Sequence, residues 1–202
     1  MTAVTISKFI GLTALYLLTT NILLGLLVSS RYNTVKRWPH RHINIFRWHN
    51  RTGYVALGIA ICHPVTILFS STAHFRILDI TIPLWSPSQP VENTIGAVAL
   101  YSVSFVVVTS YFRKRLGFPL WKRFHYVAYA SAVLFFVHGL MTDPQLKHRR
   151  LDPLDAEKVS VETCILLVAG GTWMRARYAV RTRRIKAASA AARLTPASGG
   201  DE

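Results

Sequence analysis

The stretch RWHNRTGYVALGIAICHPVTILFS, residues 47–70, decides the fold because it sets His49 and His63 fourteen residues apart in an otherwise apolar segment. An α-helix rises about 1.5 Å and turns about 100° per residue. This spacing therefore separates the two imidazoles by about 21 Å along the axis but only about 40° around it. Both imidazoles then face the same neighbouring helix at two depths.

A second stretch, WKRFHYVAYASAVLFFVHGLM, residues 121–141, repeats the arrangement with His125 and His138 thirteen residues apart. On an ideal helix this spacing leaves His138 about 140° away from the face that His125 occupies. A π-bulge, a kink or a marked tilt is needed to bring both imidazoles to one side. With such a distortion the two stretches offer two pairs of histidines, and without it they offer one.

The apolar residues are gathered into five segments of about 18 residues or more, the length that crosses a hydrocarbon core of about 30 Å. The segments are Thr5–Ser29, Ile43–Ser70, Thr94–Phe112, Phe124–Met141 and Val159–Tyr178. The sequence therefore predicts an all-α membrane protein, a bundle of about five transmembrane helices within residues 1–178. Residues 179–202 are predicted to form a basic, disordered cytoplasmic tail.

The net charge of +15 comes from short basic clusters between these apolar segments, without a recognisable nucleic-acid-binding motif. Assigning residues 30–52, 113–123 and 175–202 to one side places 18 of the 24 lysines and arginines there. The positive-inside rule then predicts an outer N-terminus and a cytoplasmic C-terminus, in a bacterial inner (plasma) membrane. The same distribution argues against a nucleic-acid-binding protein.

Four histidines at membrane depth in two matched pairs indicate a functional site, because ionisable residues there are energetically costly. Neutral imidazole ligates haem iron well, and two imidazoles fill both axial positions. The predicted helices over 43–70 and 124–141 are separated by one antiparallel helix and so run in the same direction. His49 is therefore predicted to pair with His125 near the inner face and His63 with His138 toward the outer face. The direct interpretation is two stacked b-type haems (heme b).

Other interpretations of the histidines are open at this point. They would merely hydrogen-bond between helices in a non-redox scaffold subunit. Zinc is a weaker alternative, since no acidic or thiolate partners lie at matching depth. Around the inner pair, Arg47, Arg51, Lys122 and Arg123 are candidates to bind haem propionates or to attract the phosphates of a flavin donor. The positive-inside rule alone would also explain these basic residues.

The residues Trp48-His49, Gly53-Tyr54, His63-Pro64, Trp121, Phe124-His125-Tyr126 and His138-Gly139 resemble the ferric reductase-like transmembrane domain of ferric reductases and NADPH oxidases. The resemblance covers roughly residues 43–141. It implies two histidine pairs, fourteen and thirteen or fourteen residues apart, with each haem shared between two helices. It therefore implies His49, His125, His63 and His138 as iron ligands in a membrane cytochrome b.

Relatives of that kind continue into a flavin and nicotinamide domain, whereas no glycine-rich nucleotide motif follows the last apolar segment of this chain. We therefore expect electrons from a cytosolic flavoprotein or from free reduced flavin (FMN or FAD). The predicted function is ferric reductase-like electron transfer across the membrane, to a ferric chelate or a periplasmic protein. The alternative is a resemblance to the haem-binding membrane subunit of the periplasmic methionine sulfoxide reductase system, which feeds a periplasmic oxidoreductase.

Overall fold

The computed structural model describes residues 3–30, 44–70, 74–142 and 155–194, and this part of the chain is helical without strands. The predicted all-α fold is therefore confirmed for the described residues. In chain order the elements are α1 (Ala3–Ser29), α2 (Ile45–Ile67), α3 (Ile77–Thr81), the 3₁₀ helix η2 (Pro83–Trp85), α4 (Pro90–Tyr111), α5 (Arg113–Leu116), α6 (Phe118–His125), α7 (Val127–Met141) and α8 (Ala156–Leu194).

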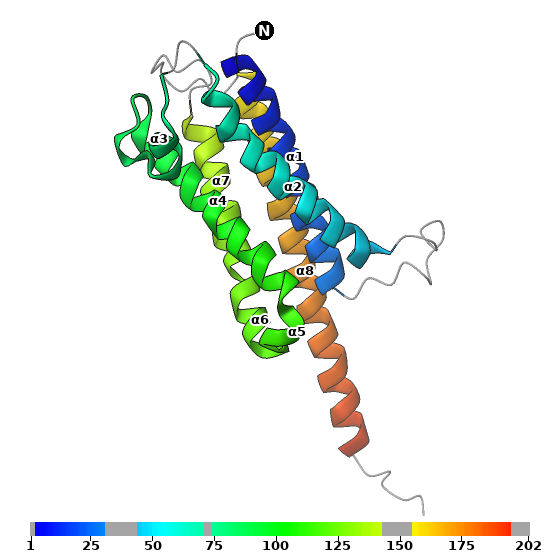
Figure 1. Cartoon of the computed structure of the whole chain (residues 1–202). Helices are drawn as coiled ribbons and strands as arrows, with labels where there is room; N and C mark the ends of the chain where they lie inside the picture. Colours follow the sequence, from blue (N-terminus) through cyan, green and yellow to red (C-terminus); the bar gives the residue numbers. More distant parts are fainter. Residues whose placement is uncertain (1–2, 31–43, 71–73, 143–154, 195–202) are drawn as a thin grey trace, which may run out of the picture.

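The long helices run side by side along one axis (Figure 1). Helix α1 packs against α2 and α8, α2 packs against α4, α4 packs against α7, and α7 packs against α8. These contacts close a ring in which α2 and α7 lie on opposite sides of the interior. The two histidine-bearing helices thus face each other, with α1 and α4 as their outer supports.

Local sequence explains where the histidine-bearing helices begin and break. Asn44 caps α2, because its side chain accepts a hydrogen bond of 3.0 Å from the backbone N–H of Arg47. Gly117, at φ +75°, separates α5 from α6, and the proline that follows lies in the first turn of α6. At Tyr126 the helix is interrupted again, directly after His125. The distortion that the thirteen-residue spacing requires is therefore located at the start of α7.

Within the described residues, three helical segments are long and apolar enough to cross a membrane, namely Ala3–Ser29, Pro90–Tyr111 and Phe118–Met141. Together with the family assignment below, they make this an integral membrane protein. Helix α2 is less apolar than these three segments because it contains Asn50, Arg51, His63 and Pro64. In α8 the apolar stretch is flanked by charged residues in the first two turns and by arginines from Arg175 onward.

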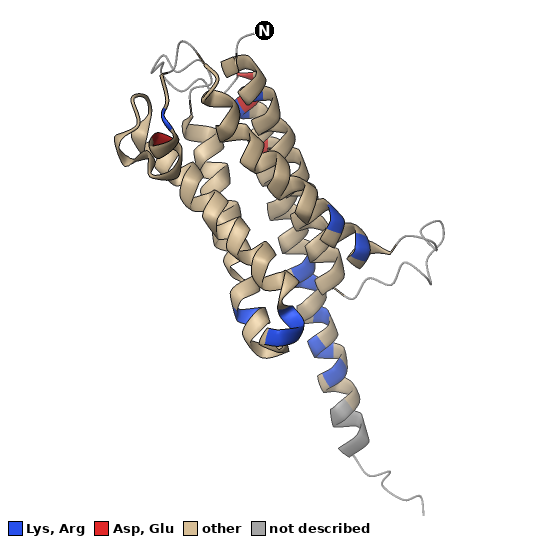
Figure 2. Ribbon diagram, viewed as in Figure 1, with Lys and Arg blue, Asp and Glu red and all other residues tan. Residues whose placement is uncertain are grey.

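Charge divides the bundle into two ends (Figure 2). We call one the basic end, which carries Arg47, Arg51, Arg113, Lys114, Arg115, Lys122 and Arg123, with further basic residues on α8 from Arg175 onward. We call the other the acidic end, which carries Asp79, Glu92, Asp155, Glu157 and Glu162 beside Lys8, Arg76 and Lys158. Among the described residues, the acidic side chains thus lie away from the basic clusters.

The structure differs from the predicted tail. Helix α8 continues through residue 179 to Leu194, and it extends beyond the other helices at the basic end (Figure 1). Residues 179–194 are therefore helical rather than disordered. The physical reason is their composition, since alanine, arginine and lysine are among the strongest helix formers. Residues 195–202 lie outside the described part of the chain.

Candidate functional site: two histidine pairs

The structure brings the four histidines together as two pairs across the interior of the ring. The ring centroids of His49 and His125 are 6.2 Å apart, with an angle of 78° between the ring planes. Those of His63 and His138 are 6.4 Å apart, with an angle of 69°. One pair lies toward the basic end and the other toward the acidic end. The same pairs are those predicted from the parallel direction of the two helices.

On one side of the ring, α1 holds both imidazoles of α2. The Nδ1 atom of His49 lies 3.0 Å from the carbonyl oxygen of Asn21, and that of His63 lies 2.8 Å from the carbonyl oxygen of Ser7. The Ser7 hydroxyl also donates to the His63 carbonyl at 2.9 Å. Because the two accepting residues are themselves fourteen residues apart, one antiparallel helix serves both histidines.

On the other side, α4 supports the imidazoles of α6 and α7. The Nδ1 atom of His138 lies 2.8 Å from the carbonyl oxygen of Glu92. His125 is different, since its Nδ1 atom lies 3.4 Å from the hydroxyl of Ser110, which also accepts a hydrogen bond of 3.2 Å from the indole N–H of Trp121. The Trp121 ring packs against His125 at 5.1 Å between centroids.

These hydrogen bonds fix the tautomer of three histidines. A carbonyl oxygen can only accept, so Nδ1 carries the proton in His49, His63 and His138. In a neutral imidazole the remaining nitrogen, Nε2, then carries the lone pair. Metal-binding histidines have this arrangement, with the second ring nitrogen donating to a carbonyl or carboxylate. The arrangement leaves Nε2 available as a ligand atom in each of the three.

Small residues on α1 and α4 make room for the imidazoles. A Cβ atom at Gly11 would lie 2.9 Å from Nδ1 of His63, and one at Gly96 would lie 2.8 Å from Nδ1 of His138. At Gly25 it would lie 3.2 Å from Cε1 of His49. None of these three glycines was predicted from the sequence to belong to the site. Their spacing could have indicated a role, because Gly11 and Gly25 are fourteen residues apart, as are His49 and His63.

A cavity opens beside the pair of the acidic end. His63 and His138 both line it, together with apolar side chains from all five long helices. Its polar lining is concentrated among residues of the acidic end, including Lys8, Asp79, Glu157 and Lys158. The cavity thus has an apolar body, two imidazoles and a polar margin, as ligand sites commonly do.

The basic residues predicted near the inner pair all lie at the basic end. Arg47, Arg51, Lys122 and Arg123 are exposed, and each stands within two or three residues of His49 or His125 in the sequence. Among the described residues no group of three or more His, Cys, Asp or Glu side chains comes together as a metal site. The histidines therefore occur as pairs rather than as a complete protein-made metal cage.

Fold and site together define an all-helical membrane protein with two histidine pairs inside a ring of helices. The family model described as "Ferric reductase like transmembrane component" matches residues 10–136. The chain therefore belongs to the ferric reductase-like transmembrane component family, which confirms the predicted resemblance. The match contains His49, His63 and His125 and ends two residues before His138. No curated protein and no solved structure matches the chain.

Proposed function

We propose that the chain is a membrane cytochrome b that carries electrons between the two faces of the membrane through two b-type haems. Residues 1–178 form the haem domain, with α1, α2, α4, the α6–α7 segment and α8 as five spans. His49 and His125 hold one haem at the basic end, and His63 and His138 hold the other at the acidic end. The observation that carries the proposal is the pairing of imidazoles at 6.2 and 6.4 Å.

The spacing of each pair fits a shared metal ion. Metal–imidazole bonds measure about 2.0 Å, and a five-membered ring with sides of about 1.35 Å places its nitrogen about 1.15 Å from its centroid. Two imidazoles on opposite sides of one metal ion would therefore have centroids about 6.3 Å apart. The observed distances agree with that value. A haem iron also needs only two protein ligands, since the porphyrin supplies the other four.

The protein's own contribution is to orient and desolvate these ligands. The carbonyls of Asn21, Ser7 and Glu92 hold protons on Nδ1 and so direct Nε2 to the interior. Apolar walls around the acidic-end pair exclude water, which affects the reduction potential of a bound iron. When bound, haem supplies one-electron oxidation and reduction at its iron.

The charge distribution supports a direction for the electrons. The positive-inside rule places the basic end in the cytoplasm, with the N-terminus outside and the C-terminus inside. Exposed Arg47, Arg51 and Arg123 then attract the phosphates of FMN or FAD, free or bound to a cytosolic flavoprotein. An acceptor on the outer face, a ferric chelate or a periplasmic oxidoreductase, would receive electrons at the acidic end, where His63 and His138 would hold the haem.

A reduced-minus-oxidised difference spectrum of the purified protein tests the proposal, with haem counted per chain. We expect b-type bands and two haems. His63→Ala removes the acidic-end haem and leaves one. The matched control is His74→Ala, an exposed histidine outside both pairs, which leaves the ratio at two.

Three results would contradict the proposal in different ways. A purified protein without haem contradicts the cytochrome itself and favours a scaffold subunit. One haem per wild-type chain contradicts the second site. Loss of both haems in His63→Ala contradicts the independence of the two pairs.

A further inference from the structure

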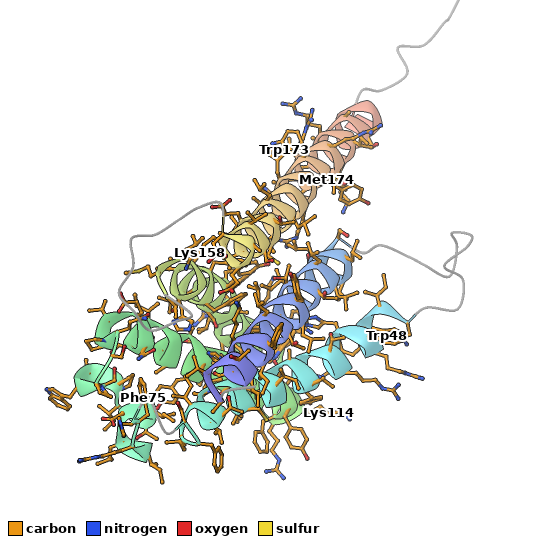
Figure 3. The ribbon with its side chains drawn as sticks, turned by 90° about the horizontal axis from the view of Figure 1, so that it is seen from above. Trp48, Phe75, Lys114, Lys158, Trp173 and Met174 are labelled. Carbon is orange, nitrogen blue, oxygen red and sulfur yellow. The ribbon has the colours of Figure 1, made fainter. Side chains whose placement is uncertain are left out.

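Lys158 is a lysine buried at the acidic end, with 5% of its surface exposed. It is the third residue of α8, and it lies between the start of that helix and the end of α7 (Figure 3). Its ammonium group donates to the carbonyl oxygens of Gly139 at 3.0 Å, Leu140 at 2.5 Å and Thr142 at 2.6 Å. These carbonyls stand at the C-terminal end of α7, where helical partners are lacking and a positive charge is favourable.

Thr142 connects this ammonium group to the imidazole of His138. Its backbone N–H and its hydroxyl both donate to the His138 carbonyl, at 2.9 and 2.7 Å. Its hydroxyl oxygen also lies 3.2 Å from Nδ1 of His138. Lys158 holds the carbonyl of Thr142, and Thr142 in turn contacts both the backbone and the ring of His138. One residue thus separates the buried charge from a proposed haem ligand.

We infer that Lys158 is a positioning residue for His138, and that its charge tunes the haem at the acidic end. The inference rests on the proposed function. Burying a lysine is energetically costly unless its charge is compensated, so the three carbonyl partners of Lys158 indicate a specific role for the ammonium group beside His138. A positive charge near an iron disfavours its oxidised form. Lys158 therefore raises the reduction potential of the acidic-end haem and draws electrons toward that end.

The test is a redox titration of both haems together with the low-spin EPR signal, which depends on the angle between the two imidazole planes. In Lys158→Gln we expect the acidic-end potential to fall by about 59 mV, a tenfold change in a one-electron equilibrium. We also expect the acidic-end EPR signal to shift, while the His49 and His125 haem stays unchanged. Lys158→Arg retains the charge and restores most of the potential.

The controls separate positioning from simple loss of a charge or of the fold. Lys8→Gln removes a cation of the same cavity margin, one that pairs with Glu157 on α8, so we expect the acidic-end EPR signal to stay unchanged. The basic-end haem reports whether each variant folds. Thr142→Val removes the hydroxyl beside Nδ1 and keeps Lys158, so it is expected to shift the acidic-end signals alone.

The outcomes are distinguishable. A two-haem Lys158→Gln protein with unchanged acidic-end potential and EPR signal overturns the inference. If Lys158→Gln contains no haem, Lys158→Met is measured instead, because it also removes the charge. A lower acidic-end potential with a shifted EPR signal then supports the inference, and unchanged values overturn it. A wild-type protein without the acidic-end haem overturns the proposed function first, and this inference with it.

Discussion

Helix α2 and the α6–α7 segment present their histidines to one another with different backbones. Helix α2 is continuous from Ile45 to Ile67, and its two histidines are fourteen residues apart. The α6–α7 segment is interrupted at Tyr126, and its two histidines are thirteen residues apart. The two pairs nevertheless have almost equal separations of 6.2 and 6.4 Å. Spacing in the sequence therefore does not determine the geometry without the local backbone.

The interruption at Tyr126 changes the twist of the helix in the direction that the thirteen-residue spacing requires. The N–H of Tyr126 bonds to the carbonyl of Arg123 at 3.2 Å, and the N–H of Tyr129 bonds to that of Tyr126 at 3.1 Å. Both bonds span three residues, as in a 3₁₀ helix, which turns about 120° per residue instead of about 100°. This overwinding rotates His138 toward the face of His125. The contrast between the two segments can be tested by altering either the spacing or the supporting helices.

The largest effect is expected from equalising the spacings. An alanine inserted between Ala132 and Val133 makes the second spacing fourteen residues, as in α2. It also rotates His138 by about 100° and moves it by about 1.5 Å relative to His125. We expect the acidic-end haem to be lost and the ratio to fall from two to one. An alanine inserted after the exposed Ile185, in the C-terminal part of α8, is the control and keeps both haems.

Adding one methyl group to α4 tests how closely this helix holds His138 of the α6–α7 segment. In Gly96→Ala the new Cβ would lie 2.8 Å from both Nδ1 and Cε1 of His138, closer than such atoms approach. The imidazole must move, so we expect most molecules to lose the acidic-end haem while the basic-end haem remains. Gly58→Ala, with no atom within 4 Å of the added Cβ, should bind two haems. Equal haem content in the two variants would contradict the steric role of Gly96.

The equivalent change at Gly25, beside the basic-end pair on α1, is expected to be milder. In Gly25→Ala the added Cβ would lie 3.2 Å from Cε1 of His49, a contact that a small shift of the ring relieves. We expect two haems per chain, with the basic-end haem released at a lower temperature than in the wild type. Thermal release followed by the difference spectrum measures this change. An effect as large as that of Gly96→Ala would show that α1 holds its histidine as rigidly as α4 does.

The fold and the site could be predicted from the sequence where chemically distinctive residues occur at a recognisable spacing. The four histidines predicted the two facing helices, and the thirteen-residue spacing of His125 and His138 predicted a distortion in the second of them. The role of Lys158 could not be predicted, because its partners are backbone carbonyls, which leave no mark in a sequence. The support from α1 and α4 was missed for a related reason. A glycine's role depends on which helix packs against it, and that contact appears only in the folded chain.

The smallest effect is expected at His125, which differs from the other three histidines of the two pairs because its Nδ1 faces a hydroxyl rather than a carbonyl. Ser110→Ala removes that hydroxyl, which lies 3.4 Å away and is also bound by Trp121. Hydrogen bonds between membrane helices average about 0.6 kcal/mol, so the basic-end reduction equilibrium should change by no more than about threefold. The matched control, Ser131→Ala, removes a buried hydroxyl that donates to the Ala99 carbonyl at 3.0 Å. It should lower stability by a similar amount and leave both potentials unchanged. A tenfold change in Ser110→Ala would mean that the hydroxyl orients His125 as firmly as the carbonyls orient the other three histidines.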